Sequence, residues 1–188
     1  MTAPQTKPEI LRELKSLHER STRYWDAFST ADFLAPIGDA WSPADNVRHL
    51  GKSVRAVARG LRVPKLLLFL RFGPSRRASR GYEELRDVYR GLLAEGGKAG
   101  RFAPAPEGAP ADAAAWRREL MGRREADARA LERAVEPWSE KALDRYRMPH
   151  PLLGELTVRE MLFFTLYHNL HHVENVARRT GIGFAAEG

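Results

Sequence analysis

The sequence predicts an all-α protein, an up-and-down four-helix bundle with an extra short helix and long connectors. Apolar residues recur at helical spacing in five segments, and several of these segments open with helix-capping residues. Almost no stretch has the strict alternation of a strand. The length of 188 residues suits one compact domain, residues 1–188, with a sizeable core.

The first helix is expected at residues 8–30. A turn at residues 36–38 ends this element. Its apolar side chains are spaced to form one stripe. These residues are Leu11, Leu14, Leu17, Trp25 and Phe28.

The second helix is predicted to begin at Ser42 and to run to about Gly60. Ser42 is a favourable N-cap, Pro43 suits the first helical position, and Asp45 suits the third. Its buried stripe is expected to consist of Val47, Leu50, Val54, Val57 and Leu61.

Residues 61–80 are expected to form a connector, because they contain Pro64, Gly73, Pro74 and a basic stretch. An apolar run at residues 63–72 lies inside it and is too short to span a bilayer. The apolar side chains of this run need a packing partner, and there are three alternatives. The run covers the core, forms a dimer face, or lines the entrance to a pocket. We favour the first two.

Three further segments follow. Residues 82–94 are predicted to form a short helix, and residues 112–135 a long one rich in alanine and charge. Between them, residues 96–111 form a Gly/Pro/Ala loop that we expect to contain no helix. Residues 137–155 are expected to be irregular.

The last helix is predicted to begin at Thr157 and to stop before Gly181. Thr157 and Glu160 form a capping box, and a glycine is typical just after a helix ends. Helices joined by loops of this kind pack as an up-and-down bundle.

Composition excludes several kinds of function. The chain has no cysteine, so a disulfide scaffold, a cysteine-ligated zinc site and a catalytic thiol are excluded, and any metal must be bound by His, Asp or Glu.

The net charge is +7, but the basic residues are interleaved with acidic ones, as at residues 117–136. This pattern is typical of a solvated helix face, and we expect no nucleic-acid partner. The N-terminal residues contain no apolar signal core, so we expect a cytoplasmic protein without a membrane span.

Three of the six histidines, His168, His171 and His172, lie within five residues of one another. Side chains at positions i and i+4 of a helix lie on the same face, so His168 and His172 can meet one ion. On a helical wheel both lie at the edge of the apolar face, whereas His171 falls among polar residues. The pair His168 and His172 is therefore preferred, and His171 is assigned to the surface or to a supporting role.

A catalytic metal with an open position needs a third protein ligand, and His49 is the best candidate. It lies at the edge of the apolar stripe of its helix, with Asn46 and Ser53 beside it. The residues alone leave two interpretations open, because a buried histidine can also be a hydrogen-bonded core residue. His150 is expected to anchor its loop, and Glu160 has its explanation in the capping box.

Three stretches of the chain resemble the DinB-like (DinB/YfiT) superfamily of bacterial four-helix-bundle metal proteins. They are WSPADNVRHL at 41–50, GYEELRDVYRGLLAEGGKAGRFAP at 81–104 and HPLLGELTVREMLFFTLYHNLHHVENV at 150–176. The first and last carry the pattern, a histidine on the second helix and H-x-x-x-H on the last. The resemblance covers most of the chain and implies that His49, His168 and His172 bind a divalent ion, zinc or nickel.

The resemblance also implies a function class. Characterised relatives include transferases and isomerases that use a low-molecular-weight thiol such as mycothiol or bacillithiol, and members are often homodimers. We therefore expect a metal-dependent enzyme of the thiol-transferase or hydrolase type, with a small-molecule substrate. The alternative is a metal-binding or stress-response module without catalysis.

Overall fold

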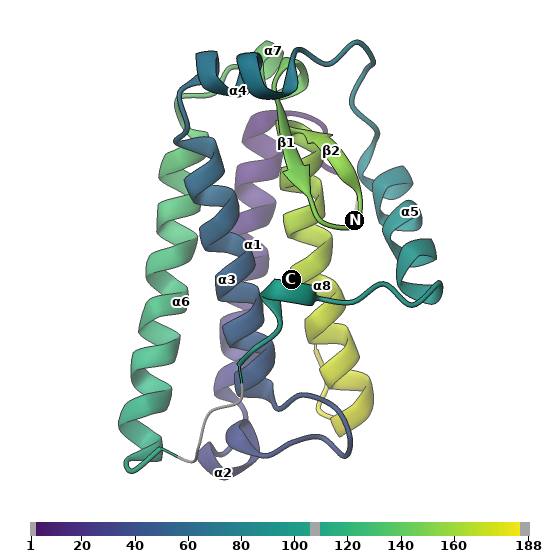
Figure 1. Ribbon diagram of the computed structural model, residues 1–188. Helices are drawn as coiled ribbons and strands as arrows, with labels where there is room; N and C mark the ends of the chain where they lie inside the picture. Colours follow the sequence, from purple (N-terminus) through teal and green to yellow (C-terminus); the bar gives the residue numbers. More distant parts are fainter. Residues whose placement is uncertain (1–2, 106–109, 185–188) are drawn as a thin grey trace.

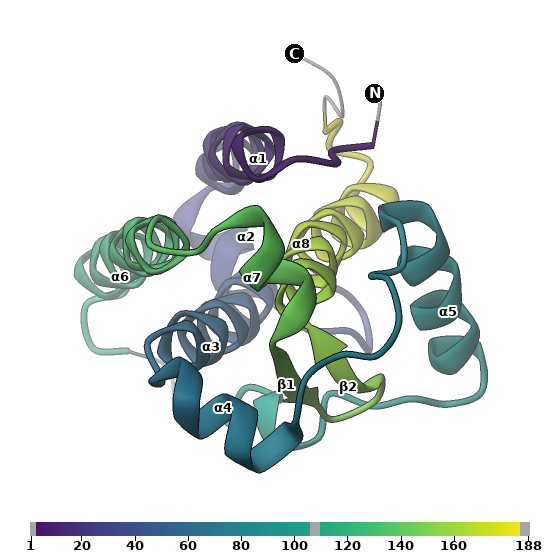
Figure 2. The same cartoon turned by 90° about the horizontal axis from the view of Figure 1, so that it is seen from above.

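Helices predominate in the computed structural model, which describes residues 3–105 and 110–184. The four longest lie side by side (Figures 1 and 2): α1 (Lys7–Asp26), α3 (Pro43–Leu61), α6 (Ala113–Val135) and α8 (Val158–Thr180). The shorter helical elements are α2 (Thr30–Leu34), α4 (Lys65–Phe72), α5 (Tyr82–Ala94), η1 (Gly100–Phe102) and α7 (Glu140–Arg145). The mainly helical fold class is thus confirmed, with one small hairpin, β1 (Arg147–His150) and β2 (Gly154–Thr157), as an exception.

The order of helix directions differs from the up-and-down prediction. α3 and α6 run in the same direction, from the end of the molecule near α2 to the end near α4 and α7 (Figure 1). Two contacts follow this parallel order: Arg55 pairs with Asp127 at 3.0 Å, and the Trp138 indole donates to the Leu61 carbonyl beyond it. The reason is the long connection at residues 62–112, which returns the chain to the end where α3 begins.

Local capping signals predicted the helix ends well. The Ser42 hydroxyl accepts from the Asp45 backbone N–H and starts α3, and Asp112 caps α6 in the same way. Thr157 and Glu160 form the expected capping box of α8, and Gly181 ends it in the left-handed region at φ 73°. The predicted short helix at residues 82–94 is α5.

Four connecting segments contain structure that the sequence pattern did not predict. The helix predicted at residues 8–30 already ends at Asp26, and Ser29 caps a separate helix, α2; residues 61–80 contain α4. Residues 96–111 contain the single turn η1, while residues 106–109 of that loop lie outside the described residues. Residues 137–155, expected to be irregular, contain α7, β1 and the start of β2. Each strand has only four residues, too few for alternation to be recognised.

The charged face of α6 is only partly solvated, which corrects the expectation for residues 117–136. Arg124 is 7% exposed and Asp127 is 9% exposed. The Arg124 guanidinium donates to the Ser21 hydroxyl of α1, and burial lowers its pKa to about 10. These two charges therefore join α6 to its neighbours instead of facing water.

The buried apolar side chains form two clusters. One lies toward the end of the molecule with α4 and α7 and includes Leu143 and Leu162; the other lies toward α2 and includes Trp25 and Val173. On α3 and α8 the clusters meet near residues 49 and 168, where buried polar side chains interrupt the core. Among the described residues, no helix has the length and apolar composition needed to cross a membrane.

Candidate metal centre

Three histidines converge at the junction of the two apolar clusters. His49 comes from α3, and His168 and His172 come from successive turns of α8, which runs antiparallel to α3. Their ligand nitrogens lie within 4.8 Å of one another, and the Nε2 atoms of His49 and His168 are 2.9 Å apart. Among the described residues this is the only group of three or more metal-ligating side chains so arranged.

These separations fit a metal ion. Histidine nitrogens bind zinc at about 2.0–2.1 Å in a tetrahedral arrangement, so two of them on one ion are about 3.3 Å apart. The 2.9 Å between the Nε2 atoms of His49 and His168 is close to this value. The widest separation in the group has to shorten on metal binding, and this movement is easiest for the half-buried His172.

Hydrogen bonds fix the orientation of two of the three rings. The His49 Nδ1–H donates to the Phe102 carbonyl at 2.9 Å, because a carbonyl can only accept. The His172 Nδ1 lies 2.7 Å from Asn46 Oδ1, and the Asn46 amide nitrogen donates to the Ser42 carbonyl, which settles the direction of that amide. Both rings therefore carry their proton on Nδ1 and present the Nε2 lone pair to the centre.

All three imidazoles are neutral at physiological pH. Burial lowers the pKa of His49, with a smaller contribution from Lys52 that opposes the effect of the Phe102 hydrogen bond. Burial, together with neighbouring histidines, holds the pKa of His168 and of His172 well below the usual value. A neutral imidazole is the form that binds a metal, so burial prepares these side chains for an ion.

Two residues of the centre were missed by sequence reasoning. The Trp41 ring stacks on His172 at 6.1 Å with a 6° angle between the planes, and it also lies 5.1 Å from the His49 ring. The Phe102 carbonyl comes from η1, 53 positions after His49. Trp41 begins the WSPADNVRHL stretch and could have been suspected from its place there, whereas a backbone carbonyl in a distant loop has no sequence signal.

The other candidate residues lie outside the group. His171 faces away from the centre and borders a surface depression with Arg90 and Arg178. Glu160 does not orient a ligand: its buried carboxylate caps Thr157 and pairs with Arg77 and Arg80.

His150 anchors its turn, as expected. Its Nδ1 accepts from the backbone N–H groups of Leu152 and Leu153 at 3.2 and 3.0 Å. It also lines a cavity that reaches His49 and His168.

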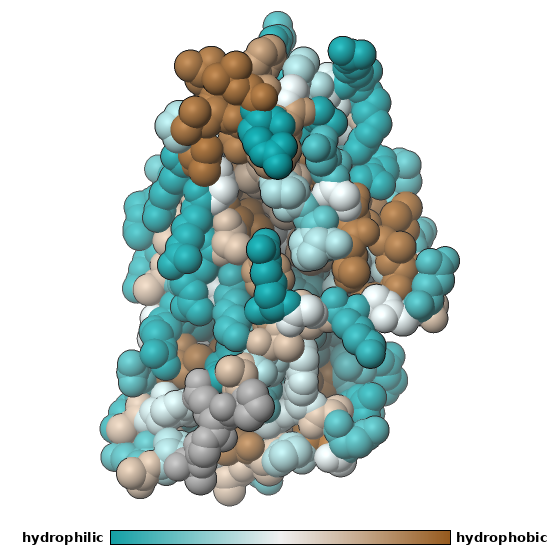
Figure 3. Space-filling view, viewed as in Figure 1, coloured by the Kyte–Doolittle hydropathy of each residue, from teal (hydrophilic) through white to brown (hydrophobic). Residues whose placement is uncertain are grey.

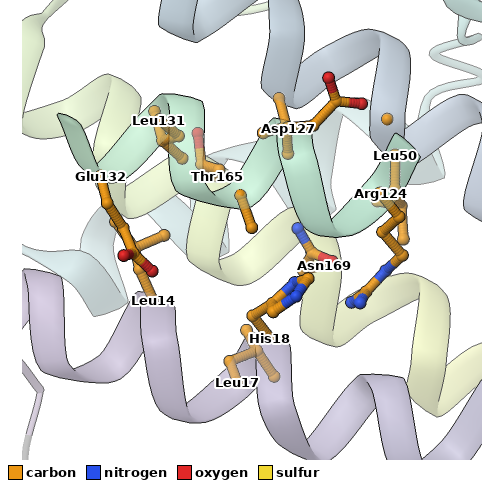
Figure 4. Close-up of a pocket in the computed structure, with 13 residues that line it drawn as sticks. Leu14, Leu17, His18, Leu50, Arg124, Asp127, Leu131, Glu132, Thr165 and Asn169 are labelled. Atoms are coloured by element: carbon orange, nitrogen blue, oxygen red, sulfur yellow. The ribbon is translucent and has the colours of Figure 1, made fainter. Parts of the chain in front are cut away.

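That cavity has a volume of about 450 Å³ and is open to solvent. A second, much smaller cavity of about 40 Å³ lies between α1, α3, α6 and α8, with His18, Arg124 and Asn169 on its wall (Figure 4). The second cavity has room for a few water molecules only. The large cavity is therefore the one that can bring a substrate to the histidines.

Comparison with known proteins gives one match. The model of a family described as the DinB superfamily matches residues 13–176, which include all three histidines. No curated protein and no solved structure matches the chain.

Proposed function

The chain belongs to the DinB superfamily, and from this premise we propose that it binds a divalent ion, zinc or nickel, through His49, His168 and His172. The observation that carries the proposal is the convergence of the ligand nitrogens of three neutral imidazoles, two of which, His49 and His172, are held with their Nε2 lone pairs toward the centre. In this proposal residues 1–188 form a single DinB-like domain, and α1, α3, α6 and α8 are the four helices of its bundle.

We further propose that the protein is a metal-dependent enzyme that transfers a low-molecular-weight thiol to an electrophile or performs a hydrolysis. When bound, a divalent ion with three neutral ligands supplies a Lewis acid that lowers the pKa of a thiol or water. The cavity of about 450 Å³ beside His49 and His168 supports catalysis, because a purely structural ion needs no such access.

The chain's own residues prepare this chemistry. Phe102 and Asn46 hold the rings of His49 and His172 in the binding orientation. The cavity offers no ready general base. Burial raises the pKa of Tyr89 to about 12, and both backbone hydrogen bonds to His150 use the Nδ1 lone pair, which leaves a proton on its Nε2. An ion held by His49, His168 and His172 would therefore have to supply the acidity of the nucleophile.

A thiol-transfer assay tests the catalytic part. The consumption of cysteine, mycothiol or bacillithiol by monochlorobimane is followed with metal-loaded protein, chelated protein and chelated protein resupplied with zinc or nickel. We expect acceleration that disappears on chelation and returns with metal. His49→Ala should be inactive, whereas His171→Ala should retain activity. Equal rates with loaded and chelated protein would contradict catalysis by the bound ion.

The alternative is a metal-binding or stress-response module without catalysis. Stoichiometric metal binding with no activity toward any thiol or ester would favour it. A homodimer remains part of the proposal on the strength of the superfamily resemblance, and a cytoplasmic location remains part of it as the sequence predicts; sedimentation of the purified protein tests the first.

A further inference from the structure

The large cavity beside the histidines is a groove that runs along α3. One face of α3 lines it over almost three turns, from His49 through Ser53 and Val57 to Gly60. At about 1.5 Å per residue, these positions span about 16 Å. In a fully extended alkyl chain each bond of about 1.5 Å advances the chain by about 1.25 Å, so a chain of about twelve carbons is about 14 Å long and fits within this length. We call this cavity the α3 groove.

The walls of the α3 groove are mostly apolar. They are formed by Val57 of α3, Leu68 and Phe72 of α4, Met148 of β1, and Met161 and Phe164 of α8. The low-molecular-weight thiols expected for this superfamily are polar, and little in these walls would bind them. The groove is therefore suited to the second, apolar reactant.

The opening of the groove is also apolar. α4 lies across its end, and Leu67 both lines the groove and is 54% exposed. The neighbouring side chains Leu66 and Leu70 are 66% and 70% exposed, and they form the brown area over α4 in Figure 3. An apolar chain can thus pass from this surface into the groove along the leucines of α4.

The charged residues that line the groove are all basic. They are Arg71 on α4, Lys98 before η1 and Arg101 within it, and no Asp or Glu side chain among the described residues lines the groove. Within the described part of the chain, none of the three forms an ion pair with a carboxylate. Lys98 and Arg101 lie in the segment whose Phe102 carbonyl contacts His49, which places two of the three charges at the histidine end. Arg71 and Arg101 lie over the rings of Phe72 and Phe102, and no carboxylate of the described residues neutralises the three cations. Basic side chains of this kind around an apolar groove match an anionic ligand.

We propose that the α3 groove binds an elongated apolar molecule with one carboxylate end, of the medium-chain carboxylate class. Its carboxylate lies near Lys98 and Arg101 and its chain runs along α3 toward α4. This inference rests on the proposed function in taking the histidine end of the groove as the place where the ligand reacts. Binding itself requires only the groove, its walls and the two cations.

Calorimetric titration of chelated protein with decanoate, 1-decanol and acetate tests the proposal. We expect decanoate to bind saturably, one molecule per chain, with 1-decanol weaker and acetate without measurable binding. Ala56→Phe places a ring in the groove from an exposed helical position, so the fold should tolerate it. It should weaken decanoate binding at least tenfold, whereas the control Ala114→Phe, on an exposed position of α6, should bind as the wild type does.

A second pair of variants tests recognition of the charge. The double variant Lys98→Gln/Arg101→Gln should weaken decanoate binding at least fivefold and leave 1-decanol binding unchanged. Arg118→Gln/Arg133→Gln, which removes two exposed charges from α6, should have no effect. Absence of saturable decanoate binding, binding that Ala56→Phe leaves unchanged, or equal binding of decanoate and 1-decanol overturns the proposal.

The same titrations separate this proposal from the metal site. Because they are made on chelated protein, a chain that never binds metal yet binds decanoate contradicts the proposed function and supports the groove. A chain that binds metal through the three histidines yet gives no decanoate binding, chelated or loaded, overturns the groove proposal alone.

Discussion

His171 and His172 are adjacent in the sequence but lie in different surroundings. The His172 ring meets Asn46 and Trp41 between α3 and α8, whereas His171 borders a surface depression with Arg90 and Arg178. Position on the helical wheel separated the two, because the 100° step between neighbours on a helix turns one toward the core and the other away. The contribution of His172 to metal binding depends in turn on Asn46, which accepts a hydrogen bond from its Nδ1–H.

Replacing Asn46 should weaken metal binding without removing a ligand. In Asn46→Ala the His172 Nδ1–H loses its acceptor, so the ring is free to turn away from His49 and His168. We expect the affinity for zinc to fall by about 10- to 100-fold, as is usual when a partner that orients a ligand is removed. Competition with a chromogenic chelator measures the change. Asn175→Ala, which removes a half-buried amide of α8 that bonds Arg178 and no histidine, is the control. An affinity equal to that of the wild type in Asn46→Ala would show that the amide does not orient the ring.

The sequence supplied the three histidines but not the atoms around them. His168 and His172 follow from helical spacing, and His49 from its place on an apolar edge and from the resemblance. The Phe102 carbonyl could not be predicted, because any residue offers the same carbonyl and only the path of the 96–111 loop brings this one to His49. The sequence placed Asn46 beside His49 on the same helix. Its amide oxygen, however, accepts a hydrogen bond from His172 of α8.

At the scale of elements, the start of α8 is held by a buried carboxylate. Glu160 is fully buried, caps the Thr157 N–H and pairs with Arg77 and Arg80 of the connector before α5. Burial raises the pKa of its carboxyl, but the hydrogen bonds from Arg77 and Arg80 outweigh this effect and lower the pKa to about 2. One carboxylate thus anchors both the last helix and the connecting segment.

This ion-pair network should make stability depend on pH. The pKa of Glu160 is about 2 in the folded chain and 4.5 as the reference value, so its contribution is fully present above about pH 4.5 and is lost as the pH falls toward 2. The shift corresponds to about 3 kcal/mol. Glu160→Gln keeps the capping geometry but removes the charge.

We expect Glu160→Gln to lower the free energy of unfolding by about 3 kcal/mol at pH 7 and to flatten its decline between pH 4.5 and 3. Urea unfolding at several pH values measures both effects. Glu155→Gln, which breaks an exposed pair with Arg147, should change stability by less than about 1 kcal/mol. Equal effects of the two substitutions would contradict the anchoring role of Glu160.

Elements with a strong local signal were predicted, and those defined by tertiary contacts were not. The caps of α3, α6 and α8 depend on residues three positions apart, which the sequence displays directly. α4 begins at Pro64 with no side-chain cap, and the hairpin is held by pairing between two four-residue strands. Their formation depends on packing against α3 and α8, which spacing along the chain does not reveal.

At the scale of the whole molecule, the crossover at residues 62–112 decides where the site can form. It carries α4, α5 and η1 around α3 and α8 (Figure 1), and residues of α4, η1 and β1 line the α3 groove. A strictly up-and-down bundle with short loops would leave this face of α3 and α8 open to solvent. The parallel order of α3 and α6 is therefore linked to the existence of the groove.

The net charge of +7 should not produce binding to nucleic acid. Many basic side chains are paired with carboxylates within their own helix or with a neighbour, such as Arg129 with Glu125 and Arg159 with Asp144. Pairing leaves few phosphate-binding charges on any one element. We expect no retention of a duplex DNA fragment at physiological salt in an electrophoretic assay; a retained complex that dissociates steeply with rising salt would contradict this.

The most direct test of the central claim is the metal content of the loaded and desalted protein, measured by mass spectrometry of the elements. We predict one zinc or nickel ion per wild-type chain and one per chain in His171→Ala. We predict less than about a tenth of that amount in His49→Ala and in His172→Ala, since each loses one of three ligands. A wild-type chain without stoichiometric metal, or His49→Ala and His172→Ala that both retain it, would contradict the claim that these three histidines form a metal centre.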